Sequence, residues 1–205
     1  MNRHFGDIMR TKAASFLPAL SFLFVLPFLF TPAFAQHQTF TVDPQTSTVA
    51  FTLGGSGHAT EGTFHVEKGA VDFDRSSPKM SGSILVSAAS GKTGNDSRDK
   101  KMINEVLDAP HFSDVTFAPQ SYTGAIAPTG DSTIQVTGVF TLHGAPHDMT
   151  VPMQIHIDGA NCTTKTHFVV PYIKWGLKDP SWFVLKVAKE VDVDLTLKGS
   201  LSPAS

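Results

Sequence analysis

Short runs in which apolar and polar residues alternate place the tightest limit on how this chain can fold. The run Val191–Leu197 carries an apolar residue at every odd position and Asp or Thr at every even one, and Gly199 follows soon after. Val151–Ile157 repeats the pattern. Because side chains at i and i+2 share one face of a strand, each run predicts a β-strand with one apolar and one polar face.

Similar runs recur along most of the chain, and little helical pattern is left to cover a sheet. Their number predicts about eight to ten strands, which must bury their apolar faces by closing a barrel or by stacking two sheets. We expect an all-β, antiparallel barrel of about eight strands, with a bulge at Gly138. The other predicted strands are Phe40–Val42, Val49–Leu53, Thr63–Val66, Ala70–Phe73, Ser83–Ser87, Val115–Phe117, Ile134–Leu142 and Thr166–Val170.

One segment departs from the strand pattern. In Asp96–Ala109, the apolar residues between positions 102 and 107 recur at i, i+1, i+4 and i+5, which is one face of a helix. Asn95 or Asp96 can cap the start of this helix, and Pro110 can end it. The sequence therefore predicts one helix of about three turns near the mouth of the barrel.

The first 35 residues have the three parts of a secretory signal peptide. Three basic residues precede an uncharged, Leu- and Phe-rich stretch, Ala13–Phe34, which ends in the small-x-small pattern of Ala33 and Ala35. An uncleaved membrane anchor is the alternative, because the stretch is just long enough to cross a bilayer. We expect residues 1–35 to be removed on export to the periplasm or the exterior, with no membrane span in what remains.

Composition limits the partners of the remaining residues 36–205, which suit one domain. Removal of three basic residues from 16 and one acidic residue from 18 leaves 13 against 17, a net charge of −4. This balance favours neither nucleic acid nor an anionic membrane surface as a partner. Cys162 is the only cysteine, so no intrachain disulfide can form.

Four stretches in this order make the chain similar to the YceI-like family, exported lipocalin-like barrels associated with polyisoprenoid lipids. The resemblance implies the same fold and ligand class here. It spans nearly the whole chain after residue 35. The stretches are Thr41–Pro44 with Ser47–Phe51, Thr93–Val106 with its Arg98-Asp99 pair, Gly138–Gly144 with Val151–Met153, and Trp175–Leu177 with Glu190–Leu197.

The chain departs from the family pattern at two places. Lys101-Met102 stands where a His-Leu step commonly follows the Arg-Asp pair, and Lys174 stands where an acidic residue often precedes the aromatic-Gly pair. Both departures fall at elements expected to border the pocket. We therefore expect them to affect the head group of the ligand.

A lipid-binding barrel needs an apolar interior, and bulky apolar residues are available in or beside the predicted strands. A chain of about 40 carbons could yield on the order of 12 kcal/mol of binding free energy with no charged contact. The same residues could instead fill a solid core; the resemblance favours a cavity. The expected lipid-binding residues are Phe51, Leu53, Phe64, Ile84, Val86, Met102, Val106, Phe117, Phe140, Leu142, Phe168, Trp175, Phe183, Val193 and Leu195.

Metal binding and catalysis are two weaker interpretations. His143 and His147 are four residues apart, but a Gly-Ala-Pro turn separates them and no second cysteine or carboxylate cluster completes a ligand set. Ser56 lies near His58 and Glu61, yet its surroundings lack the spacing of a nucleophile elbow. We expect no catalytic residue, no metal and no cofactor, and hence a protein that is not an enzyme.

The segment before the last strand carries two tryptophans, Trp175 and Trp182, that could form either a rim for an entering lipid or a plug.

Whether the protein transports, stores or senses a lipid stays open, as does homodimer formation. The alternative function is a ligand-free barrel acting as an envelope stress or interaction protein.

Four lysines that could meet a phosphate head group are Lys174, Lys178, Lys186 and Lys189.

Overall fold

A computed structural model describes residues 37–181 and 186–204. The expected leader over residues 1–35 lies outside these residues, as do Trp182 and Phe183. Within the described part, no helix is both long and apolar enough to cross a bilayer.

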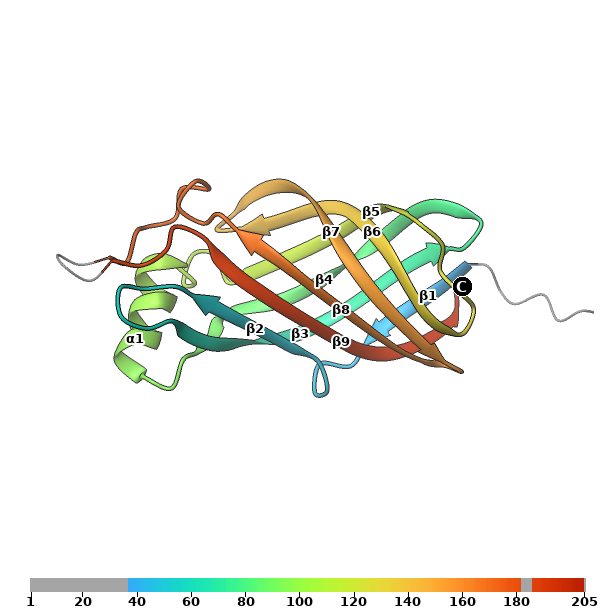
Figure 1. Cartoon of the computed structure of the whole chain (residues 1–205), viewed down its shortest axis with the longest axis horizontal. Helices are drawn as coiled ribbons and strands as arrows, with labels where there is room; N and C mark the ends of the chain where they lie inside the picture. Colours follow the sequence, from blue (N-terminus) through green and yellow to red (C-terminus); the bar gives the residue numbers. More distant parts are fainter. Residues whose placement is uncertain (1–36, 182–185, 205) are drawn as a thin grey trace, which may run out of the picture. The chain divides into compact units, whose positions relative to one another are not determined.

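The described residues form one antiparallel sheet that closes on itself (Figure 1). From β3 to β9, each strand pairs with the next one along the chain, and β9 returns to pair with β1 and β2. The strands are β1 (His37–Val42), β2 (Thr48–Leu53), β3 (Thr60–Asp74), β4 (Ser77–Lys92), β5 (Asp114–Thr123), β6 (Gly130–Leu142), β7 (Ala145–Asp158), β8 (Asn161–Val170) and β9 (Val191–Pro203).

Two short strands share one place in this barrel. Both β1 and β2 lie between β3 and β9: Phe40 of β1 pairs with Val71 and Leu201, whereas Val49 of β2 pairs with Phe64 and Leu195. The nine strands therefore fill eight positions around the barrel. The predicted all-β, antiparallel barrel of about eight strands is confirmed.

A bulge joins two predicted strands into one. Thr63–Val66 and Ala70–Phe73 both belong to β3, whose register against β4 shifts between Val66 and Lys68. The extra residue, Glu67, reverses the alternation, so that the buried positions change from even to odd numbers at this point. The break in sequence period thus marks a bulge within a long strand rather than the end of a strand.

The bulge predicted at Gly138 is wrong. Strand β6 runs unbroken through Gly138, and the irregularity lies opposite, in β5, where the register shifts between Pro119 and Ser121. A Cβ atom at position 138 would lie 2.5 Å from the carbonyl oxygen of Ala118. Glycine is needed here because the two backbones approach closely.

The predicted helix begins where expected and ends three residues early, at Val106 instead of Ala109. The Asn95 side chain accepts a hydrogen bond from the backbone N–H of Arg98 (3.0 Å), which confirms Asn95 as the N-cap. The helix ends early because Asp108 adopts a left-handed conformation with φ of 48°. It consists of α1 (Asp96–Lys101) and a π-helical turn, η1 (Met102–Val106).

Buried side chains gather in two regions of the barrel interior. Near the end opposite α1, where β1 and the end of β9 lie (Figure 1), Ile134, Val136, Ile157 and Leu197 are each at most 2% exposed. At the α1 end, a second and smaller cluster packs Val106 of the helix against buried residues that include Leu142, Val170, Tyr172 and Leu177. A hollow remains between these two packed regions.

Candidate ligand-binding cavity

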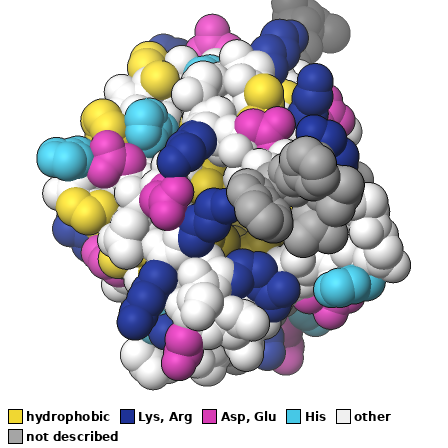
Figure 2. Space-filling view, turned by 90° about the vertical axis from the view of Figure 1, so that its left-hand side faces the viewer, with side chains coloured by type: hydrophobic (Ala, Val, Ile, Leu, Met, Phe, Trp, Pro, Cys, Tyr) yellow, Lys and Arg dark blue, Asp and Glu magenta, His cyan; other side chains and the backbone are white. Residues whose placement is uncertain are grey.

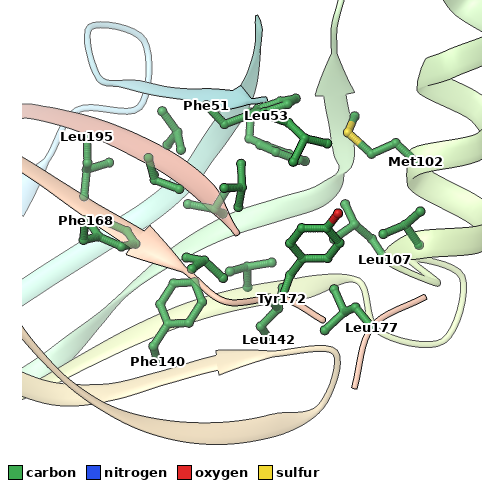
Figure 3. Close-up of a pocket in the computed structure, with 18 of the residues that line it drawn as sticks. Phe51, Leu53, Met102, Leu107, Phe140, Leu142, Phe168, Tyr172, Leu177 and Leu195 are labelled. Atoms are coloured by element: carbon green, nitrogen blue, oxygen red, sulfur yellow. The ribbon is translucent and has the colours of Figure 1, made fainter. Parts of the chain in front are cut away.

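The hollow is a cavity of about 520 Å³ inside the α1 half of the barrel. Every strand except β1 contributes to its wall, and α1, η1 and the segments between β8 and β9 close it at the mouth. Figure 3 shows Met102 and Leu107 on the helix side and Phe140, Phe168 and Leu195 on the barrel side pointing into the same space.

The alternating pattern explains why this wall is apolar. On β9, Val193 and Leu195 line the cavity while Asp192 and Asp194 are exposed on the outer face. Leu195 is only partly buried although it points inward, whereas Leu197, two residues further along the same face, is 1% exposed. The difference arises because Leu195 faces the cavity, whereas Leu197 faces closely packed side chains and only a small void of about 40 Å³.

Most of the predicted lipid-binding residues lie on this wall. These are Phe51, Leu53, Phe64, Ile84, Val86, Met102, Val106, Phe117, Phe140, Leu142, Phe168, Val193 and Leu195. Of the remaining two, Phe183 lies outside the described residues, and Trp175 is not part of the described wall. The structure thus brings the strand residues of the prediction together around one space.

Trp175 packs behind the wall. Its indole stacks on the ring of His147, with centroids 3.9 Å apart and planes 5° from parallel, and it lies 5.8 Å from the ring of Phe140. A turn begins at Pro171, whose carbonyl oxygen accepts a hydrogen bond from the backbone N–H of Trp175 (3.1 Å). This turn directs the indole toward His147 and Phe140. Trp175 therefore supports Phe140, which does line the cavity.

Sequence reasoning missed several wall residues. Val151 and Met153 lie on the apolar face of a strand that the alternation had already identified, so a signal for them was present. Tyr172, Leu177 and Val187 come from irregular segments with no periodicity, and only the fold brings them to the mouth. There the Tyr172 hydroxyl donates to the carbonyl of Ala188 (2.7 Å), and burial raises the pKa of Tyr172 to about 12.

Two cations occupy the mouth of the cavity. Within residues 37–181 and 186–204, Arg98 and Lys101 are the charged residues of the wall, and both come from α1. Lys101 Nζ donates to the carbonyl oxygen of Pro180 (3.3 Å). Figure 2, which views this end, shows apolar side chains in a hollow beside Lys and Arg side chains. The charged part of the described wall is therefore cationic.

A short hydrogen-bonded chain holds Arg98 in place. Asp99 is 3% exposed and accepts hydrogen bonds from the Thr93 hydroxyl (2.5 Å) and the Thr93 N–H (2.8 Å). The hydrogen bond from the Thr93 hydroxyl is the main cause that lowers the pKa of Asp99. In turn, Arg98 donates from Nε to Thr93 Oγ1 (2.8 Å) and from Nη2 to the Thr93 carbonyl (2.9 Å). The resemblance had singled out this Arg-Asp pair.

The residues considered for metal binding and catalysis have structural contacts. His143 packs on Phe112, with ring centroids 4.3 Å apart, and His147 stacks on Trp175. The described residues contain no group of three or more His, Cys, Asp or Glu able to hold a metal ion. The Ser56 hydroxyl donates to the Lys186 carbonyl (3.2 Å) and accepts from the Lys186 N–H (3.0 Å), which ties two loops together.

Comparison with known proteins gives a family match over most of the chain. Residues 40–199 match the family model described as the YceI-like domain. A UPF0312 protein of Pseudomonas fluorescens strain SBW25 is 28% identical over 148 residues, which cover 67% of this chain and 72% of that protein.

Solved structures share the fold. Burkholderia cenocepacia BcnA is 24% identical, with a TM-score of 0.62 over 77% of this chain and 99% of that chain. A polyisoprenoid binding domain from Saccharophagus degradans, implicated in plant cell wall breakdown, is 15% identical, with a TM-score of 0.63 over 78% and 98% of the two chains. At these identities the likeness establishes the common barrel fold.

Proposed function

Since the chain belongs to the YceI-like family, we propose that its barrel binds a long apolar lipid, foremost a polyisoprenoid, and shields it from water. One observation carries the proposal: a cavity of about 520 Å³ whose wall is built almost entirely from aliphatic and aromatic side chains. Each methylene buried there contributes about 0.8 kcal/mol before the costs of binding. The polyisoprenoid binding domain of S. degradans, which has the same fold, supports this ligand class.

In this proposal the protein acts by sequestration and is not an enzyme. The described wall contains no His, Cys, Asp or Glu that could serve as a nucleophile or as a general base. Arg98 and Lys101 at the mouth contact the polar end of the lipid, while the tail lies between the strands. The apolar wall supplies affinity, and the two cations orient the ligand.

We further propose that residues 1–35 form a cleaved leader and that residues 36–205 act in the periplasm or outside the cell. The basic start, the uncharged stretch and Ala33 and Ala35 at its end support this. N-terminal sequencing of the exported protein is expected to begin at Gln36. A chain that begins at Met1 and stays with the membrane would contradict it and favour an anchor.

Organic extraction tests the binding function directly. Purified protein is denatured in solvent, and the extract is analysed by mass spectrometry. We expect a long-chain lipid in the wild-type extract and its loss in Leu195→Asp, which places a carboxylate in the cavity wall. Thr196→Asp, one residue along β9 and on the outer face, is the matched control and is expected to retain the lipid.

Two outcomes would count against the proposal. A wild-type extract with no lipid would favour a ligand-free interaction protein. Equal lipid in the Leu195→Asp and wild-type extracts would show that the lipid binds elsewhere. Circular dichroism of both variants establishes that each is folded before the extracts are compared.

A further inference from the structure

We infer that the mouth of the cavity selects a lipid with an anionic head group, a carboxylate or a phosphate, through Arg98 and Lys101. The inference rests on the proposed function and adds the chemical class of the head group to it. Both residues belong to α1 and line the cavity at its mouth. At this end, Figure 2 shows Lys and Arg side chains beside the apolar side chains of the hollow.

The two positive charges have no counter-charge in the described wall. That wall contains no Asp or Glu, and neither Arg98 nor Lys101 belongs to an ion pair among residues 37–181 and 186–204. A neutral head group would displace water from these charges without compensating them, which costs free energy. An anionic oxygen would instead accept charge-assisted hydrogen bonds from the two cations, which are neighbours on one helix face at positions i and i+3.

The carboxylates of the helix are engaged elsewhere or lie outside the wall. Asp99 is 3% exposed and accepts its hydrogen bonds from Thr93. Glu105 forms an ion pair with Lys178 (2.8 Å), and the hydrogen bond in this pair is the main cause that lowers the pKa of Glu105. Asp96 is exposed and is not part of the described wall. The cations of the mouth are therefore left for a ligand.

Both cations are held in position by neutral acceptors. Arg98 donates from Nε and Nη2 to the hydroxyl and carbonyl oxygens of Thr93 (2.8 and 2.9 Å), and its other N–H groups make no hydrogen bond to the described residues. Lys101 Nζ donates to the carbonyl oxygen of Pro180 (3.3 Å). These contacts orient the side chains and leave their charges uncompensated. Less conformational entropy is then lost when an anion binds.

The lysines that the sequence offered for a phosphate head group lie elsewhere. All four are exposed, and none is part of the described wall: Lys174, Lys178, Lys186 and Lys189. The structure assigns this role to two residues of the helix instead. Lys100, which lies between them in sequence, is exposed and outside the described wall, so it provides a matched control on the same helix.

The experiment compares three probes that share one straight chain: dodecan-1-ol, dodecanoate and dodecyl phosphate. Each probe displaces a neutral, polarity-sensitive dye from lipid-free protein, below its micelle concentration and at about pH 8, where a carboxylic acid is ionised. The readout is the ratio of the Kd of the alcohol to the Kd of the anionic probe. A change that weakens the binding of all probes equally cancels in this ratio.

The wild type should bind each anionic probe about tenfold more tightly than the alcohol, from about threefold for each partly exposed cation. Arg98→Gln and Lys101→Gln should each reduce the ratio about threefold, and the double variant should abolish the preference. Arg98→Lys keeps the charge and should retain the preference. Lys100→Gln removes a charge from the same helix outside the described wall and should leave the ratio unchanged.

The outcomes separate the head-group inference from the proposed function. Equal Kd values for the alcohol and both anionic probes in the wild type would overturn the inference while supporting lipid binding. A preference that survives in the double variant, or that falls equally in Lys100→Gln, would overturn the assignment to Arg98 and Lys101. No binding of any probe would overturn the proposed function together with the inference.

The two anionic probes distinguish the sources of the charge. Tighter binding of dodecanoate than of dodecyl phosphate would support a fatty acid as the ligand class, and the reverse order would support a phosphorylated lipid. Circular dichroism establishes that each variant is folded. If Arg98→Gln does not fold because it loses the contacts with Thr93, Lys101→Gln tests the inference by itself.

Discussion

Measurements of the free energy of unfolding can test whether side chains leave the cavity unfilled. The test truncates two leucines on one face of β9. Leu197 is 1% exposed in the core and borders only a small void of about 40 Å³, whereas Leu195 is partly buried and lines the cavity of about 520 Å³. A change to alanine removes three carbon atoms from either side chain. In a packed core this costs about 2.4 kcal/mol of transfer free energy and, with the cavity left behind, about 3 to 5 kcal/mol in total.

The same change at Leu195 should cost much less. Its side chain already faces unfilled space on one side, so it has fewer neighbours to lose and leaves a smaller new void. We expect a loss of about 1 to 2 kcal/mol at Leu195 and hence a difference of about 2 kcal/mol between the two variants. In thermal unfolding this corresponds to roughly 4 to 8 °C.

The assay is equilibrium urea unfolding of protein refolded after lipid extraction, so that the cavity is unoccupied. The free energies of unfolding of wild type, Leu195→Ala and Leu197→Ala are compared at equal m values. Equal losses for the two variants would refute the reasoning, because they would show that Leu195 is packed as tightly as Leu197. Addition of lipid should then stabilise the wild type according to its affinity.

Three further predictions concern the scaffold. Asn95→Ala should lower the free energy of unfolding by about 1 kcal/mol through loss of the helix N-cap, while Asn95→Asp should retain it in urea unfolding. Gly138→Ala should lower the free energy of unfolding by about 1 to 3 kcal/mol, because its Cβ would lie 2.5 Å from the Ala118 carbonyl oxygen. Gly54→Ala, whose Cβ would have its nearest neighbour at 3.5 Å, should lower it far less. Calorimetry compares the two variants, and equal melting temperatures would contradict the prediction. Burial raises the pKa of Cys162 from 9.0 to about 11, so the folded thiol should react with a disulfide reagent about 100-fold more slowly than the unfolded one. The free energy of unfolding should fall as the pH rises above 9.0, because there only the unfolded thiol ionises. Fast labelling of the folded protein at pH 8 would contradict this.

The strands were predictable from sequence because alternation is a local property. Thr63–Val66 and Ala70–Phe73 were both recognised, but their union into β3 was not, since a bulge at Glu67 and a strand end produce the same break in period. The end of the helix was missed for a similar reason. The left-handed conformation of Asp108 leaves no mark in the apolar pattern that predicted the helix.

The wall of the cavity divides in the same way. Phe51, Phe140 and Leu195 could be named in advance because each lies on the apolar face of a predicted strand. Tyr172 and Val187 could not, because they reach the mouth through turns whose course depends on the finished barrel. Trp175 shows the converse case: its residue type suggested the pocket, while a turn places its ring behind Phe140.

The sequence by itself determined that the chain forms antiparallel strands with one apolar face each, because that property depends only on the alternation of side chains. It could not determine whether those faces meet in a solid core or surround a hollow. Only the tertiary structure decided this, since the width of the interior depends on strand number, tilt and bulges acting together around the closed sheet. The same inward face of β9 therefore reaches open space at Leu195 and packed side chains at Leu197.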